Sequence, residues 1–191
     1  INIQDSDQPW SGIWVYSGTG STVDIAIGDI VQVTGDVEEY NLLTEIICDA
    51  ADVVVIGESA GLPTIVIEDL ADVHDESLEG MLVWVEGTSV DEDADTYGQW
   101  DIEDSSGSVQ IEDQYIDWDL ILGAYYEMYA TVGQSSYDTG YEVAPIDSSA
   151  IWETPPCTDN LVFIEMYDAY GDGWNGNVLT IGADSLTVES G

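Results

Sequence analysis

Residues 29–37 read DIVQVTGDV, and residues 124–132 follow a similar pattern, AYYEMYATV. A glycine precedes each run, and the two glycines are 95 residues apart. The motif IQDS at residues 3–6 likewise returns as IEDS at residues 102–105. Repetition at a nearly fixed spacing is typical of two copies of one structural unit. Because both runs contain many strand-forming residues, the expected unit is a small β-barrel.

The rest of the chain carries the same strand signals. GIWVY, DVVVIG, MLVWVEGTSV and NVLTIG are rich in Val, Ile, Trp and Tyr, and Gly, Asp and Ser separate such runs. No convincing amphipathic helical pattern is found, and the loop-bounded polar stretches at residues 49–52 and 75–80 allow short helical turns. The sequence therefore predicts an all-β protein.

The first copy of the repeat is shorter at its start than the second. MLVWVEGTSV, at residues 81–90, precedes IEDS as a first strand, whereas only two residues precede IQDS. The missing strand is expected either from another copy of the chain or from sequence upstream of Ile1. An unpaired barrel edge invites a strand from another chain. The expected domains are a barrel lacking its first strand at 1–63, a second barrel at 64–153 and a partial C-terminal β module at 154–191.

The charge of the chain restricts its partners. Forty Asp and Glu residues stand against no Lys or Arg, which gives a formal net charge of −40. Self-repulsion on this scale requires screening salt or bound divalent cations to offset it. Nucleic acid is an unfavourable partner because its phosphates are normally bound by Lys and Arg. No apolar run approaches the ~18 residues of a membrane span.

DAYGDGWNG, at residues 168–176, is the candidate metal site. Asp168, Asp172 and Asn175 supply oxygen atoms and the glycines permit a tight loop, which suits Ca²⁺. The loop is not an EF-hand, because Leu179 stands where the twelfth-position Glu would be needed. A glycine-rich hairpin turn without metal is the alternative.

GESAG, at residues 57–61, matches the G-x-S-x-G pattern of a hydrolase nucleophile elbow. Such an elbow must lead into a helix, whereas Pro63 and a strand-like run follow here. His74 is the only histidine, and it is expected in a linker. The match is interpreted as coincidence, and no enzyme activity is predicted.

The aromatic residues have two interpretations. Trp10, Trp14, Tyr16 and Tyr40 are candidates for stacking on sugars, which some barrels of this size bind. Alternatively, the seven Trp and eleven Tyr residues fill barrel cores and interfaces. The second interpretation is preferred because it needs no ligand.

Several phrases resemble a known family. PWSGIWVY, LEGMLVWVEG and GQWDIEDSSG look like the tandem OB-fold segments of secreted bacterial proteins, including those attached to extracellular nucleases. The resemblance covers about residues 1–153 and implies two five-stranded OB-like Greek-key barrels. The tail CTDNLVFIEMYDAYGDGWNGNVLTIG resembles a small β module of secreted bacterial proteins marked by YDSYGDGWNG, with Ala169 in place of the usual Ser. An extracellular bacterial protein is implied.

The two cysteines, Cys48 and Cys157, suit a secreted chain. A bond between them would add roughly 4 to 5 kcal/mol of stability on the loop-entropy model. In the module that the tail resembles, the tail cysteine usually pairs further along the chain. Both pairings stay open.

Two functions are expected. The first is a structural, self-assembling subunit of an extracellular fibril or surface polymer. Residues 177–190 alternate like a strand, so they are expected to complete the first barrel of the next copy, head to tail, with divalent cations between subunits. The alternative is a calcium-dependent adhesion or carbohydrate-binding accessory module of a larger secreted protein.

Overall fold

The computed structural model describes residues 1–18, 22–91, 94–95, 97–112, 120–134 and 140–156, together with two short strands at 179–181 and 184–186. The chain divides into two compact units, Ile1–Pro156 and Cys157–Gly191. Both halves of the repeat lie in the first unit. In the second unit, β14 (Leu179–Ile181) and β15 (Asp184–Leu186) pair in antiparallel fashion.

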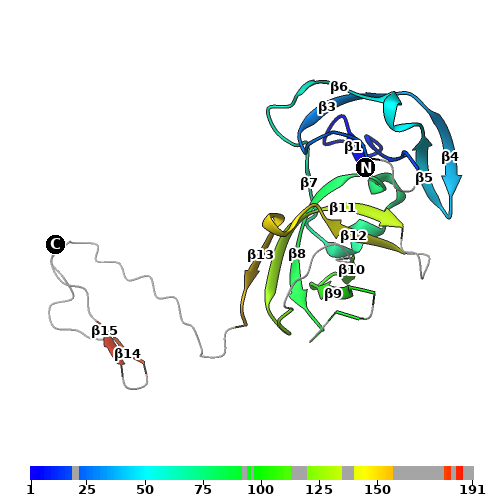
Figure 1. The fold of residues 1–191 in the computed structure, drawn as a ribbon. Coiled ribbons are helices and arrows are strands. Elements are labelled where there is room, and N and C mark those ends of the chain that lie inside the picture. Colours follow the sequence, from blue (N-terminus) through cyan, green and yellow to red (C-terminus); the bar gives the residue numbers. More distant parts are fainter. Residues whose placement is uncertain are drawn as a thin grey trace, which may run out of the picture. The chain divides into compact units, whose positions relative to one another are not determined.

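A closed five-stranded barrel forms the second half of the first unit (Figure 1). Around the barrel the order is β8, β9, β10, β12, β11 and back to β8. Every neighbouring pair is antiparallel except β10 with β12, which is parallel. Closure removes the free edges that an open sheet would have. The barrel strands are β8 (Leu82–Ser89), β9 (Gln99–Glu103), β10 (Ser108–Glu112), β11 (Tyr125–Gln134) and β12 (Tyr141–Pro145).

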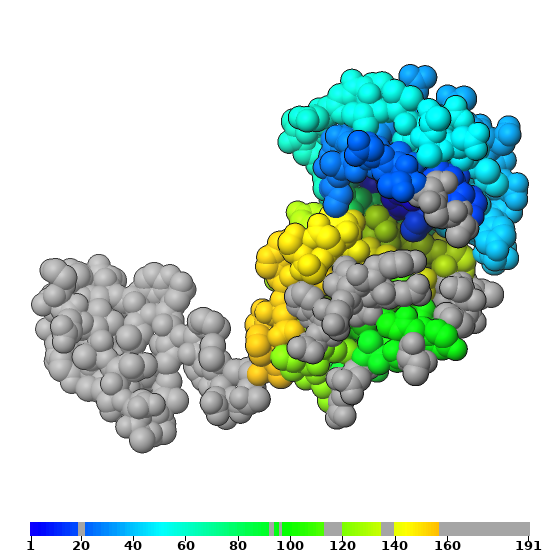
Figure 2. Space-filling view, viewed as in Figure 1, coloured from blue at the N-terminus to red at the C-terminus, as the bar shows by residue number. Residues whose placement is uncertain are grey.

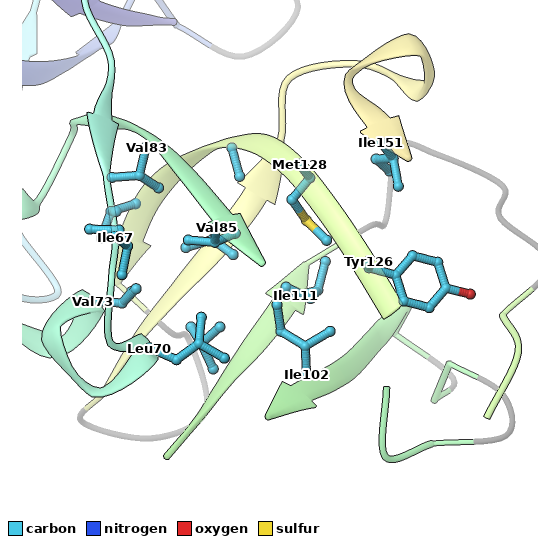
Figure 3. Close-up of a cluster of buried hydrophobic side chains, with 14 of the residues drawn as sticks. Ile67, Leu70, Val73, Val83, Val85, Ile102, Ile111, Tyr126, Met128 and Ile151 are labelled. Atoms are coloured by element: carbon cyan, nitrogen blue, oxygen red, sulfur yellow. The ribbon is translucent and has the colours of Figure 1, made fainter. Parts of the chain in front are cut away.

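Alternation along the strands builds the barrel core. In β11, the residues from Tyr126 to Val132 alternate between fully buried and half-buried, as a pleated strand with one inward face requires. Val85 of β8, Ile102 of β9 and Ile111 of β10 converge on the same interior (Figure 3). The branched apolar side chains of these strands therefore face each other inside the ring.

The first half of the unit is open by comparison. One sheet has the strand order β1-β2-β5-β4, and β3 and β6 form a separate antiparallel pair. In the space-filling view these residues make a blue and cyan lobe beside the green and yellow barrel (Figure 2). The strands are β1 (Asn2–Gln4), β2 (Gly12–Tyr16), β3 (Asp29–Val33), β4 (Asp36–Tyr40), β5 (Leu43–Ile47) and β6 (Val53–Glu58).

Short elements complete the first unit. β7 (Ile65–Val66) lies parallel to β8, and β13 (Ile151–Thr154) lies antiparallel to β11. The helices are single 3₁₀ turns, η1 (Ala50–Asp52), η2 (Leu70–His74), η3 (Glu76–Leu78) and η4 (Ser148–Ala150). The predicted all-β class and the predicted helical turns near residues 49–52 and 75–80 are confirmed. Among the helices in the described residues, none is long and apolar enough to cross a membrane.

Candidate functional site

The strand pairings of the first half repeat those of the barrel one by one. The antiparallel pair β1–β2 matches β9–β10, and the parallel pair β2–β5 matches the parallel pair β10–β12. Antiparallel β4–β5 and β3–β6 match β11–β12 and β11–β13. Strands β3 and β4 together therefore correspond to the single long strand β11.

Individual residues correspond as well. Glu45 on β5 and Glu142 on β12 pair with the equivalent central strands, and both are buried. Gly28 and Gly123 precede β3 and β11, and their φ angles are +95° and +76°. Both glycines thus adopt the left-handed conformation that this turn requires. The two repeats can be compared residue by residue.

Strand β8 has no counterpart among the described residues of the first half. In the barrel it joins β9 to β11. The corresponding strands β1 and β3 have one described strand partner each, β2 and β6. One edge of β1 and one edge of β3 therefore have no described strand beside them.

A cleft of about 830 Å³ is bordered by these two edges. Residues 1–5, which include β1, line it together with residues 25–31, which include the start of β3. Residues of β2, of the turn after β6 and of the barrel, among them Leu82, Thr131 and Ile146, complete the lining. The cleft thus lies where the counterpart of β8 would be expected.

The backbone of Asn2 faces away from β2, toward the side that β8 would occupy. Ile1, next to it, accepts a hydrogen bond from the Val15 N–H of β2 at 2.8 Å. Successive residues of a strand direct their backbone groups to opposite sides, so those of Asn2 point the other way. In the barrel, Asp101 corresponds to Asn2, and its carbonyl accepts from Val90 N, just after β8, at 3.2 Å. A strand entering the cleft would find the same acceptor.

Two buried polar atoms belong to residues that line the cleft. Asn2 Oδ1 and Trp14 Nε1 have no hydrogen-bond partner among the described residues. Their residues are cross-strand partners on β1 and β2. An unsatisfied buried acceptor or donor costs about 1–3 kcal/mol.

The inner face of β3 and β4 is only partly covered. Val37 is 69% exposed, whereas its barrel counterpart Val132 is fully buried. The other two inward valines are only half-buried, although their counterparts are fully buried. A strand in the cleft would cover apolar surface of this kind. The three pairs are Val31 with Tyr126, Val33 with Met128, and Val37 with Val132.

Glu79 ties the first half to the chain that leads into the barrel. Its carboxylate accepts a hydrogen bond from Thr44 N at 2.7 Å. Burial raises the pKa of Glu79, and the bond from Thr44 offsets part of this effect. Burial also raises the pKa of Tyr141 to about 12, with the charges of Glu79 and Glu76 adding to it. Carboxylates here are stabilised by neutral donors, since the sequence has no Lys or Arg.

The predicted calcium ligands Asp168, Asp172 and Asn175 lie outside the described residues, so the calcium loop stays a prediction. Within the described part of the chain, no three His, Cys, Asp or Glu side chains gather as metal ligands. Cys48 is half-buried and has no disulfide partner among the described residues, and burial raises the pKa of its thiol. Cys157 is outside the described residues, so the Cys48–Cys157 bond also stays a prediction.

The residues of the GESAG match have separate partners. Ser59 Oγ donates to the carbonyl of Gly61 at 2.5 Å, within its own turn after β6. His74 lies in η2, where Nδ1 accepts from Tyr141 N and Nε2 is 3.3 Å from Ser108 O. The structure therefore gives no Ser59–His74 pair, and β7 follows where an elbow would need a helix.

The aromatic residues fall into two environments. Trp10, Tyr16 and Tyr40 are exposed and Trp14 is half-buried, whereas Trp100 and Tyr126 belong to the barrel core. The sequence analysis missed a cluster on the outer face of the barrel. Its ring centroids lie 4.7, 5.4 and 6.0 Å apart, and alternation in β8 and β11 is the signal that would have found it. The members are Trp84, Tyr129 and Trp152.

Comparison with models of known protein families finds none that matches this chain. Comparison with curated proteins likewise finds no match.

Proposed function

We propose that this chain is a structural subunit that joins copies of itself, head to tail, into an extracellular fibril or surface polymer. The observation that carries the proposal is the cleft between β1 and β3, at the position of a missing barrel strand. A strand supplied by a second copy completes the first repeat. No chemical reaction is needed for this role.

Two forces favour strand addition at this cleft. Main-chain hydrogen bonds form along the unpaired edges of β1 and β3, as in other cases of β-augmentation. Burial of apolar surface on Val31 and Val33 contributes about 25 cal/mol per Å² removed from water. Both terms act without ion pairs, which suits a chain that has no Lys or Arg.

Polymer growth follows from the use of unlike surfaces. A groove at one place and a strand at another make a head-to-tail contact, and contacts of this kind propagate into rings or filaments unless two copies exchange strands reciprocally. Repulsion between subunits of net charge −40 opposes assembly. Calcium or other divalent cations between the carboxylates offset this repulsion, and the proposal assigns them that role.

We propose further that each repeat is an OB-like Greek-key unit, complete in the second half and short of one strand in the first. The closed five-stranded ring of the second half supports this assignment. The parallel β10–β12 pair supports it too, because the chain must pass through β11 before returning beside β10.

Electron microscopy and sedimentation of the full chain at millimolar calcium test the polymer. Fibres are expected for the native chain and for Thr34→Asp, which adds a carboxylate at an exposed position just after β3. Val31→Asp, which places a carboxylate on the inner face of β3, is expected to give folded monomers. A monodisperse native monomer under these conditions would contradict the proposal.

A second candidate function is carbohydrate binding by an accessory module, favoured by the outer aromatic cluster. Trp152 is 46% exposed and lies opposite Glu127 on β11. An exposed indole beside a carboxylate is able to stack on a sugar ring and accept its hydroxyl groups. Glycan-array binding that is lost in Trp152→Ala, with fibres absent, would favour this alternative.

A further inference from the structure

Strand β8 shows which side chains a strand would need in order to fill the equivalent position beside β1 and β3. Val83 and Val85 of β8 are fully buried, and they stand opposite Ala130 and Met128 of β11. A replacement strand therefore needs apolar side chains two residues apart. It must run antiparallel to β3, as β8 runs antiparallel to β11.

Gly87 adds a size limit two residues further along. A Cβ atom built there would lie 3.0 Å from Leu70 Cδ1, 3.1 Å from Glu103 O and 3.1 Å from Ile102 Cβ. Gln4 and Ile3 are the counterparts of Glu103 and Ile102 in the first repeat, so two of these neighbours recur there. The third requirement is thus a small residue at the position of Gly87.

Residues 186–190, LTVES, meet all three requirements. Leu186 and Val188 fall at the positions of Val83 and Val85, and Ser190 falls at that of Gly87. Glu189 also matches the exposed Glu86. Residues 179–183, LTIGA, have the same spacing of two apolar residues followed by a small one. The sequence alone therefore leaves two candidate donor segments, 179–183 and 186–190.

The β14–β15 hairpin of the second unit distinguishes between the two candidate segments. Residues 179–181 form β14 and are already paired with β15, whose last residue is Leu186. Using residues 179–183 as the donor would break that pairing. A donor that begins at Leu186 takes only the last residue of β15, so the other two residues of β15 stay paired with β14.

We infer that residues 186–190 of a second copy enter the cleft antiparallel to β3 in one fixed register. The inference rests on the proposed function and names the donor that the proposed polymer uses. The register places Ser190 opposite Val31, Glu189 opposite Gln32 and Val188 opposite Val33. A shift by one residue would turn Val188 outward, and the apolar inner face selects against it.

Disulfide cross-linking of full-length chains tests the register. A Gln32→Cys chain is mixed with a Glu189→Cys chain under mild oxidation, and bonded peptides are mapped after cleavage at acidic residues. The matched control mixes Gln32→Cys with Gly182→Cys, the same position in the competing run. The expected result is at least tenfold more linkage between positions 32 and 189 than between positions 32 and 182, since directly opposite residues have Cβ atoms about 4.5–5.5 Å apart.

The outcomes separate this inference from the polymer itself. Fibres with dominant linkage to position 182, or with linkage to neither position, would overturn the donor assignment and leave the polymer proposal standing. Native chains that stay monomeric would overturn both. A disulfide formed within one monomer of the Gln32→Cys/Glu189→Cys double variant would overturn the second copy as the source of the strand.

Substitution at Ser190 gives an independent measurement. Ser190→Ala keeps a small side chain and is expected to assemble at the native critical concentration. Ser190→Trp is expected to raise the critical concentration at least tenfold, because the position opposite Val31 admits only a small residue. Equal critical concentrations for the two variants would contradict the register.

Discussion

Val37 and Val132 hold equivalent positions in the two repeats, opposite Ile46 and Val143, yet Val37 is 69% exposed and Val132 is fully buried. The same residue type therefore lies in solvent in one repeat and in a closed core in the other. The difference comes from barrel closure, because β8 pairs with β11 and closes the barrel, whereas no described strand pairs with the corresponding edge of β3.

Truncation of these two valines is expected to have unequal effects on the free energy of unfolding. Val132→Ala leaves a core cavity and is expected to destabilise the chain by about 2 kcal/mol. Val37→Ala removes exposed atoms and is expected to change stability by less than about 0.5 kcal/mol. Urea unfolding followed by tryptophan fluorescence, at concentrations below assembly, measures both. Equal losses would mean that Val37 is covered in solution.

Gly87 is expected to tolerate no bulky side chain. Gly87→Val would force its side chain against Ile102 and Leu70, and overpacking of this kind costs about 1–3 kcal/mol. Gly133→Ala on β11 is the matched control, because its nearest neighbour, Trp14 Cζ2, would lie at an ordinary 3.6 Å. Thermal unfolding by circular dichroism is the measurement. A loss for Gly133→Ala as large as for Gly87→Val would contradict the packing argument.

Asp104 is expected to stabilise the barrel in a pH-dependent way. Burial alone would raise the pKa of Asp104, but hydrogen bonds from Ser106, Leu70 N and Gly107 N outweigh it and lower the pKa to about 2. This folded-state pKa lies below the ordinary value of 3.8. The contribution is therefore present above pH ~4 and is lost as the pH falls toward 2.

The variant Asp104→Ala is expected to lose about 1 kcal/mol at pH 7, less than is usual for hydrogen bonds to a charged group, because solvent screens this carboxylate. Asp147→Ala is its control, because the Asp147 carboxylate makes similar bonds to Ser149, within its own turn, whereas Asp104 also reaches Leu70. Denaturant titrations between pH 2.5 and 7 should show the difference between native chain and Asp104→Ala shrinking as the solution becomes acidic. A constant difference would argue against a role for the charge.

Calcium is expected to bind through Asp168, Asp172 and Asn175. Replacing Asp168 and Asp172 by Asn removes two charges from the site and should weaken calcium binding at least tenfold in isothermal titration calorimetry. Asp91→Asn is a control that alters net charge outside this loop. If the double substitution leaves calcium binding unchanged, the loop is better interpreted as a hairpin turn without metal.

The strands were predictable because runs rich in Val, Ile and aromatic residues alternate with polar ones. The repeat was predictable because similar runs and motifs return at a nearly constant spacing. The division of residues 29–37 into β3 and β4 was not, because it depends on a contact distant in sequence. A Cβ atom on Gly35 would lie 2.3 Å from Ile47 O, so the backbone passes too close there for a regular strand. His74 illustrates the same limit, since its partners Ser108 and Tyr141 lie 34 and 67 residues further along the chain.

The edges of β1 and β3 that have no described strand beside them also give a fibre a direction. In a fibre built by filling this cleft, one extremity always presents an empty groove and the other always presents an unused tail. The two extremities are chemically different, so they grow at different rates and respond to different inhibitors. A short peptide with the sequence of the donor would cap the first extremity alone, while a chain whose tail is removed would terminate the second.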